Sequence, residues 1–274
     1  MMIIETIKDY EKLRTKNACG QYVFRGHADK DWDLLPTAYR CGSNIECPWY
    51  EKEPVSRFIQ HLQENGYRDF PSELNQVDFL TKATAVFPAE ELLPYLALAQ
   101  HYAFDSQFHW IKTSLLDVTH NLDIAACFAV EDETKWTIDG KFFVFDTSAM
   151  KEPYRFYEPL GGSRLEARLV VQDAAFIYRQ QTVEHKDDHL PYKNREPFDD
   201  TVKDTIIIPG TLKPLLKEYL QKKLFELFLC PRLVLGQVKP NMATAGYRTY
   251  EELREIHRPA VERAEKLGNK HSDY

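Results

Sequence analysis

The sequence predicts an α+β protein in a single domain, with a small, mostly antiparallel mixed sheet flanked by helices. Helical patterns come first with one early strand, and strands mixed with helices follow. The regular alternation of strands and helices that builds a doubly wound parallel sheet is missing from this order. The chain has 274 residues, 43% hydrophobic and 13% aromatic, which is enough for a sizeable core.

Apolar periodicity and turn residues place the individual elements along the chain. Helices are expected over 5–15, 53–66, 88–104, 121–130, 212–227 and 249–267. Strands are expected over 21–26, 140–148 and 204–210, and over 167–180 as a strand pair or one long bent strand. The polar segment 182–201 is expected to be a loop.

Composition narrows the class of protein. The chain carries 35 basic and 42 acidic residues, a net charge of -7, which disfavours nucleic acid as the main partner. Its first residues turn charged after four positions, unlike a secretory signal, and no run of eighteen apolar residues predicts a membrane span. Five irregularly spaced cysteines favour free thiols over a disulfide framework. We therefore expect a cytoplasmic protein with no membrane partner.

The strand at 21–26 contains an unusual charge. Arg25 directly follows Tyr22, Val23 and Phe24, where burial is expected. An unpaired buried guanidinium is costly, so Arg25 needs an anion, a group of carbonyls or a ligand. The same stretch, "YVFRGHADKDWDLLPTAYR", resembles the opening motif of the FRG domain family, which is named after its Phe-Arg-Gly triplet. The positions that fit are Phe24, Arg25, Gly26, Trp32, Leu34, Pro36 and Arg40.

Three later stretches resemble the same family in the same order. "LALAQHYAFDSQFHWIKTSLLDVTHNLDIAACFAV" fits at Gln100, His101, Tyr102, Leu115, Leu116, Asp117, Thr119, Ala125, Phe128 and Ala129. "RLVVQDAAF" fits through Arg168, Gln172 and Phe176, and "IIIPGTLKPLLKEYL" fits the last block. Departures are an insertion around "DSQFH", Lys112-Thr113-Ser114 for Pro-Thr-Arg, Val118 for tryptophan, and Ala103 and Ala174 for glycines. On this resemblance, residues 1–240 form the FRG domain and 241–274 a helical extension of it.

The resemblance extends more distantly to ADP-ribosyltransferases of the Arg-Ser-Glu type. Those enzymes also place an aromatic strand ending in arginine before a Ser-Thr-Ser strand and a strand with a catalytic carboxylate. Arg25-Gly26, Thr113-Ser114 and the "RLVVQ" strand follow that order here. This similarity implies NAD as substrate and a role as a toxin or defence effector, with a nucleotide ligand and an unknown protein or nucleic-acid acceptor.

The proposed roles follow from that chemistry. Arg25 holds the pyrophosphate, with the alternative that it pairs with Asp117 and fixes the fold. Gly26 lets the ligand approach the backbone. Thr113 or Ser114 orders the site beside Gln100, and His101 with Gln172 positions the ribose. Asp117 either takes part in binding or anchors Arg25, while Thr119 or Asn121 caps the following helix.

A catalytic carboxylate is the missing part of this site. Bond cleavage at the ribose passes through an oxocarbenium-like state that negative charge stabilises, and Gln172 has none. Glu166, six residues earlier, lies on the same strand face by parity. The competing hypothesis is a non-catalytic module that recognises a nucleotide or protein in the same cleft. His185 and His189 lack a third ligand, so no metal is expected.

Overall fold

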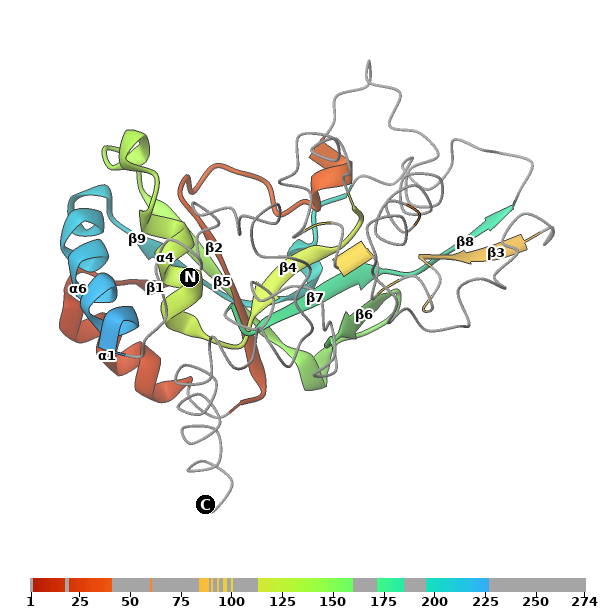
Figure 1. Cartoon of the computed structure of the whole chain (residues 1–274), viewed down its shortest axis with the longest axis horizontal. Coiled ribbons are helices and arrows are strands. Elements are labelled where there is room, and N and C mark those ends of the chain that lie inside the picture. Colours follow the sequence, from red (N-terminus) through yellow and green to blue (C-terminus); the bar gives the residue numbers. More distant parts are fainter. Residues whose placement is uncertain are drawn as a thin grey trace.

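The computed structural model describes residues 2–17, 20–40, 60, 84–88, 90, 93, 96–97, 100, 113–159, 172–184 and 196–226. Over these residues the chain forms a curled seven-stranded mixed sheet, a small two-stranded sheet and three α-helices, so the predicted α+β class is confirmed (Figure 1). None of the helices in this part of the chain is long and apolar enough to cross a bilayer.

The main sheet has seven strands in the order β1-β9-β5-β2-β4-β7-β6. The strands are β1 (Met2–Ile3), β2 (Tyr22–His27), β4 (Leu116–Thr119), β5 (Gly140–Asp146), β6 (Tyr154–Tyr157), β7 (Ala174–Arg179) and β9 (Val202–Ile208). Strand β1 runs parallel to β9, and the other neighbours in this sheet are antiparallel. Strands β3 (Thr84–Phe87) and β8 (Gln181–Glu184) form a second, two-stranded sheet at the end of the molecule away from the helices (Figure 1).

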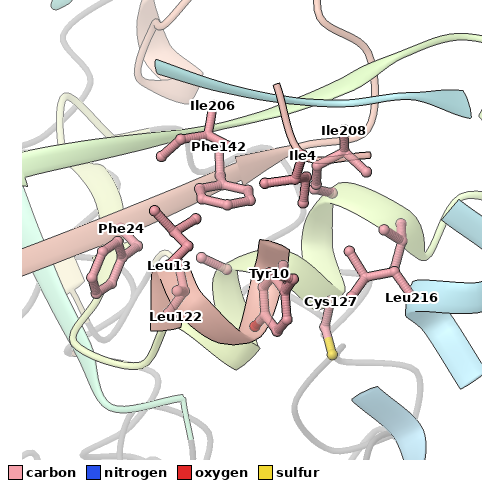
Figure 2. Close-up of a cluster of buried hydrophobic side chains, with 14 of the residues drawn as sticks. Ile4, Tyr10, Leu13, Phe24, Leu122, Cys127, Phe142, Ile206, Ile208 and Leu216 are labelled. Carbon is pink, nitrogen blue, oxygen red and sulfur yellow. The ribbon is translucent and has the colours of Figure 1, made fainter. Parts of the chain in front are cut away.

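One face of the main sheet is covered by α1 (Ile7–Lys16), α4 (Leu122–Val130) and α6 (Lys213–Glu226). Figure 2 shows the core between these helices and the strands, where Phe24, Phe142 and Ile206 meet Leu122 and Leu216. Helix α4 is apolar almost all round because it lies between the sheet and the other helices. Its nearly continuous burial fixes it against the sheet.

The opposite face of the sheet carries a second core. Val23, Phe143 and Phe145 of β2 and β5 pack there with Leu116 and Val118 of β4. Residues 34–39 and Phe198 cover this layer, since Leu34, Ala38, Tyr39 and Phe198 are buried in it. Strand β2 therefore alternates between two cores, with Phe24 on the helix side and Val23 on the other.

Most of the predicted elements in the described residues are confirmed. Helices expected at 5–15, 121–130 and 212–227 and strands expected at 21–26, 140–148 and 204–210 correspond to α1, α4, α6, β2, β5 and β9. In the segment 167–180, expected to be a strand pair or one bent strand, residues 174–179 form strand β7. The loop prediction for 182–201 is wrong at its beginning, where Thr182–Glu184 pairs with β3. The helix expected at 249–267, and nearly all of those at 53–66 and 88–104, lie outside the described residues.

Candidate functional site

The central strand β2 is paired differently on its two sides. It forms six residue pairs with β5, from Tyr22↔Asp146 to His27↔Lys141, but a single pair with β4, Phe24↔Thr119. Continued antiparallel pairing would place Gly26 opposite Asp117. Instead, Nη1 of Arg25 donates to the carbonyl oxygen of Asp117 at 2.6 Å. A side chain thus satisfies the backbone acceptor at the point where β2 and β4 separate.

A pocket of about 160 Å³ opens at this separation. Its described lining comes from β2, β4, α4, the start of β7 and Gln100: Phe24, Arg25, Gly26, Gln100, Asp117, Val118, Thr119, Ile124, Ala125, Phe128, Gln172 and Ala174. Phe24 of β2 and the apolar residues of α4 form one part of this wall, and Arg25, Asp117 and the two glutamines supply its charged and amide groups. An apolar space with a few convergent polar groups is typical of a small-molecule site.

The charge on Arg25 is only partly balanced. Its Nη1 lies 3.9 Å from Oδ2 of Asp117, beyond the usual length of a charge-assisted hydrogen bond, and its side chain is 16% exposed. Burial lowers the pKa of Arg25 to about 10; the Asp117 carboxylate opposes this shift and the nearby Arg40 guanidinium adds to it. Two guanidinium groups therefore face one carboxylate among these residues, which favours binding of an anion.

His27 orients the Arg25 guanidinium from the same face of β2. Nε of Arg25 donates to Nε2 of His27 at 3.0 Å, which requires an unprotonated ring nitrogen. Burial and the cations Arg25, Arg40 and Lys141 lower the pKa of His27 to about 2. The ring also packs edge-on against Phe143, so it is held on both sides. His27 thus fixes the guanidinium without adding a charge.

A glycine is needed at position 26 for a reason that the sequence did not predict. A Cβ at this position would overlap the Ala125 carbonyl oxygen and lie 2.9 Å from the Ala129 nitrogen, both in helix α4. The missing side chain therefore lets α4 pack directly on β2. Gly26 does line the pocket, but the helix alone requires a glycine here.

Two hydrogen-bonded pairs support the glutamines in the pocket wall. The Thr113 hydroxyl donates to Oε1 of Gln100, and the Thr119 hydroxyl donates to the backbone carbonyl of Gln172 at 2.6 Å. Thr113 and Ser114 are fully buried and do not line the pocket themselves. Thr113 therefore acts on the pocket through Gln100.

Five of the residues expected in the site meet in this one pocket: Arg25, Gly26, Gln100, Asp117 and Gln172. His101 and Glu166 lie outside the described residues. Of the two alternatives for Arg25, the contact with Asp117 is present, and the role in holding a pyrophosphate stays a prediction for a residue that lines the pocket. Of the two expected capping residues, Asn121 caps α4, with its side chain accepting from the nitrogens of Asp123 and Ile124.

Sequence reasoning missed the roles of His27 and Arg40. His27 could have been found from parity, since residues two apart on a strand share a face and Arg25 needs an acceptor. Arg40 belongs to a short 3-10 helix, Thr37–Arg40, and its Nε donates to the Leu35 carbonyl at 2.9 Å. Its approach to Arg25 depends on the path of the 28–36 loop, for which the sequence has no comparable signal.

The sequence model of the FRG domain matches residues 20–137. The chain contains an FRG domain. The match includes β2, β4 and α4 and therefore most of the described pocket wall, while Gln172 and Ala174 lie beyond it. No curated protein and no solved structure matches the chain significantly.

Within the FRG domain, the Phe-Arg-Gly triplet now has a structural explanation. Phe24 enters the core under α4, Arg25 binds the carbonyl of Asp117 across the strand gap, and Gly26 admits the helix backbone. The three residues thus contact the core, strand β4 and helix α4, respectively, at the point where the pocket forms.

Proposed function

We propose that the FRG domain binds NAD in the pocket between β2 and β4 and cleaves its nicotinamide–ribose bond, as an ADP-ribosyltransferase or NAD glycohydrolase does. The observation that carries this proposal is the under-balanced Arg25 at a pocket wall, with Arg40 nearby and Asp117 as the one carboxylate among the described lining residues. A pyrophosphate supplies the missing negative charge, and a planar guanidinium binds it well.

The size of the pocket fits one part of this ligand, the nicotinamide ring. A cavity of about 150 Å³ holds a benzene-sized ring, and this pocket measures about 160 Å³. A nicotinamide ring therefore fits against the apolar wall formed by Phe24, Ile124 and Phe128. The side-chain amides of Gln100 and Gln172 can bind its carboxamide or the ribose hydroxyls.

The test uses the full chain with NAD, following nicotinamide release by chromatography and the melting temperature in parallel. Replacing Arg25→Gln should weaken NAD binding about 10- to 100-fold, because it removes a charged hydrogen-bonding group. Arg155→Gln is the matched control: Arg155 lies on β6 and pairs with exposed Glu152, so its loss should leave NAD binding unchanged.

Arg25 also binds the backbone, so a second variant separates folding from ligand binding. Arg40→Gln leaves the Arg25–Asp117 contact in place and should still weaken NAD binding several-fold through loss of positive charge. If neither NAD nor ADP-ribose raises the melting temperature of the wild-type protein at millimolar concentration and no nicotinamide appears, the proposal is wrong.

A non-catalytic nucleotide-binding module is the second candidate. It is favoured by Gln172, which lines the pocket with a neutral amide where cleavage of NAD calls for negative charge. A rise in melting temperature with NAD and no release of nicotinamide would establish this second function instead.

A further inference from the structure

Cleavage of the nicotinamide–ribose bond places positive charge on the ribose C1′ atom, and a nearby carboxylate stabilises that charge. Asp117 is the one carboxylate among the described residues that line the pocket. We infer that Asp117 is the catalytic carboxylate of the proposed reaction. This inference rests on the proposed function and adds to it the group that Gln172 cannot supply.

The position of Asp117 in the sheet is unusual for a structural carboxylate. Strand β4 lies between β2 and β7 in the interior of the sheet, and its Leu116 and Val118 side chains are buried in the core. The Asp117 side chain on the other face is 37% exposed, because β2 has separated from β4 at this point. The sheet therefore presents a carboxylate from an interior strand to the pocket.

Arg25 contacts the backbone of residue 117 more closely than its carboxylate. The close hydrogen bond of Arg25 goes to the backbone carbonyl of residue 117, which any amino acid at this position would provide. The carboxylate Oδ2 stays 3.9 Å away from the same Nη1. The carboxylate therefore opposes the charge of Arg25 at a distance, while its side chain stays 37% exposed at the pocket.

The arrangement orders the ligand along the pocket. The nicotinamide ring takes the apolar wall of Phe24, Ile124 and Phe128, and the pyrophosphate takes the side of Arg25. Arg40 does not line the pocket and adds positive charge from nearby. The ribose lies between them, so its C1′ atom comes beside Asp117. The carboxylate then faces the atom at which positive charge develops, while Arg25 retains the phosphates.

The reaction balances with water as the second reactant. The C1′–nitrogen bond breaks, nicotinamide leaves with the bonding electron pair as a neutral molecule, and positive charge develops on C1′ opposite Asp117. A water oxygen then bonds to C1′ and releases one proton to solvent. The products are ADP-ribose, nicotinamide and a proton, and no oxidant or reductant is needed.

The decisive variant is Asp117→Asn in the full chain, which keeps the shape of the side chain and removes its charge. Nicotinamide release should fall about 10²- to 10³-fold, the usual cost of removing one group that stabilises transition-state charge. ADP-ribose, measured by calorimetry, should bind at least as tightly as to the wild type, because a negative charge has left an anion site. A purely structural Asp117 predicts the opposite, namely weaker binding together with a lower melting temperature.

Asp173→Asn is the matched control. Asp173 is an exposed carboxylate between Gln172 and Ala174, the two pocket residues at the start of β7, and does not itself line the pocket. This variant should keep wild-type release. Asp117→Ala provides an independent measurement: sodium formate should restore part of its nicotinamide release by placing a carboxylate in the vacated space, which no structural role predicts.

The outcomes separate the two proposals. Wild-type release in Asp117→Asn, or no rescue of Asp117→Ala by formate, overturns the inference while NAD cleavage by the FRG domain stands. A wild-type protein that binds ADP-ribose without releasing nicotinamide from NAD also overturns it and identifies a binding module. Absence of any binding to NAD or ADP-ribose overturns the proposed function itself.

Discussion

Two buried cations near strand β2 bind main-chain carbonyls, yet they are placed very differently. Arg25 donates to the Asp117 carbonyl at 2.6 Å, where β2 and β4 separate. Lys213, at the start of α6, donates to the carbonyls of Ala28 and Lys135 at 2.5 and 2.8 Å, and Ala28 directly follows the C-terminal end of β2. Both replace water around backbone oxygens that the sheet and helices leave unpaired.

The difference lies in how their charges are compensated. Lys213 is completely buried; burial lowers its pKa, and the carboxylates Asp29, Asp139 and Asp132 oppose that shift. Among the described residues, Arg25 has the carboxylate Asp117 against a second cation, Arg40, and it lines a pocket. The charge of Lys213 is thus opposed by several carboxylates within the fold, whereas that of Arg25 is opposed by one, which is why the proposed function assigns an anion to Arg25.

The largest expected effect comes from Gly26, which lies on β2 between the two cations. Gly26→Ala places a methyl group against the backbone of Ala125 and Ala129, which no side-chain rotation relieves. We expect a loss of more than about 4 kcal/mol in unfolding free energy, at the extreme of overpacking effects. Urea denaturation followed by circular dichroism measures it.

Gly20→Ala is the control for this substitution. A Cβ at Gly20 meets nothing within 4 Å, although its φ of +72° disfavours other residues. It should cost about 1 kcal/mol, from backbone conformation alone. Equal losses in the two variants would show that α4 does not press on β2 as described.

Lys213→Met should have the next largest effect. It leaves the buried carbonyls of Ala28 and Lys135 without a donor, which costs about 3 kcal/mol in unfolding free energy. Lys222→Met is the control, because Lys222 is exposed and pairs with Glu218 one turn away, so its replacement should cost less than about 0.5 kcal/mol.

The same variant sharpens the comparison between the cations. If Lys213 is purely structural, Lys213→Met should bind NAD with wild-type affinity wherever the protein is folded, whereas Arg25→Gln should not. Calorimetry at a temperature well below both melting transitions makes the comparison. Equal losses of affinity would mean that the two cations do not differ in the way their surroundings indicate.

The sequence predicted the long elements well and the short ones poorly. Helix α4 and strand β5 were recognisable because they have 9 and 7 residues, most of them apolar, and begin directly after Asn121 and at Gly140. Strands β4 and β6 have 4 residues each and mix polar with apolar side chains, so periodicity alone does not identify them. They depend on pairing with β7, which is a tertiary property.

Several residues that line the pocket could be predicted from the sequence, but the strand separation that forms the pocket could not. The order of the family motifs predicted Arg25, Asp117 and Gln172 as site residues, and all three line the pocket between β2 and β4. The separation of β2 from β4 depends on register, and no local pattern in "YVFRGH" or "LDVT" specifies where pairing stops. The packing role of Gly26 could not be predicted from local sequence either, since it depends on how closely α4 approaches β2.

The smallest expected effect concerns His27 and the pH dependence of stability. The pKa of His27 is lowered to about 2 in the folded protein by burial and by Arg25, Arg40 and Lys141, against an ordinary value of 6.5. Between these values the unfolded chain binds a proton that the native protein does not. The stability conferred by this histidine is therefore complete above pH 6.5 and decreases as the pH falls, by about 2 kcal/mol at pH 5.

His27→Gln tests whether a neutral acceptor is what Arg25 requires. The glutamine carbonyl can accept from Nε of Arg25 as Nε2 of His27 does, but it does not titrate. The loss of unfolding free energy between pH 7 and pH 5 should be smaller in His27→Gln than in the wild type by about 2 kcal/mol, since all other titrating groups are shared. Equal losses would mean that His27 takes up a proton in the native protein. Three positive charges would then face Asp117, and the contrast with Lys213 would be greater than the structure indicates.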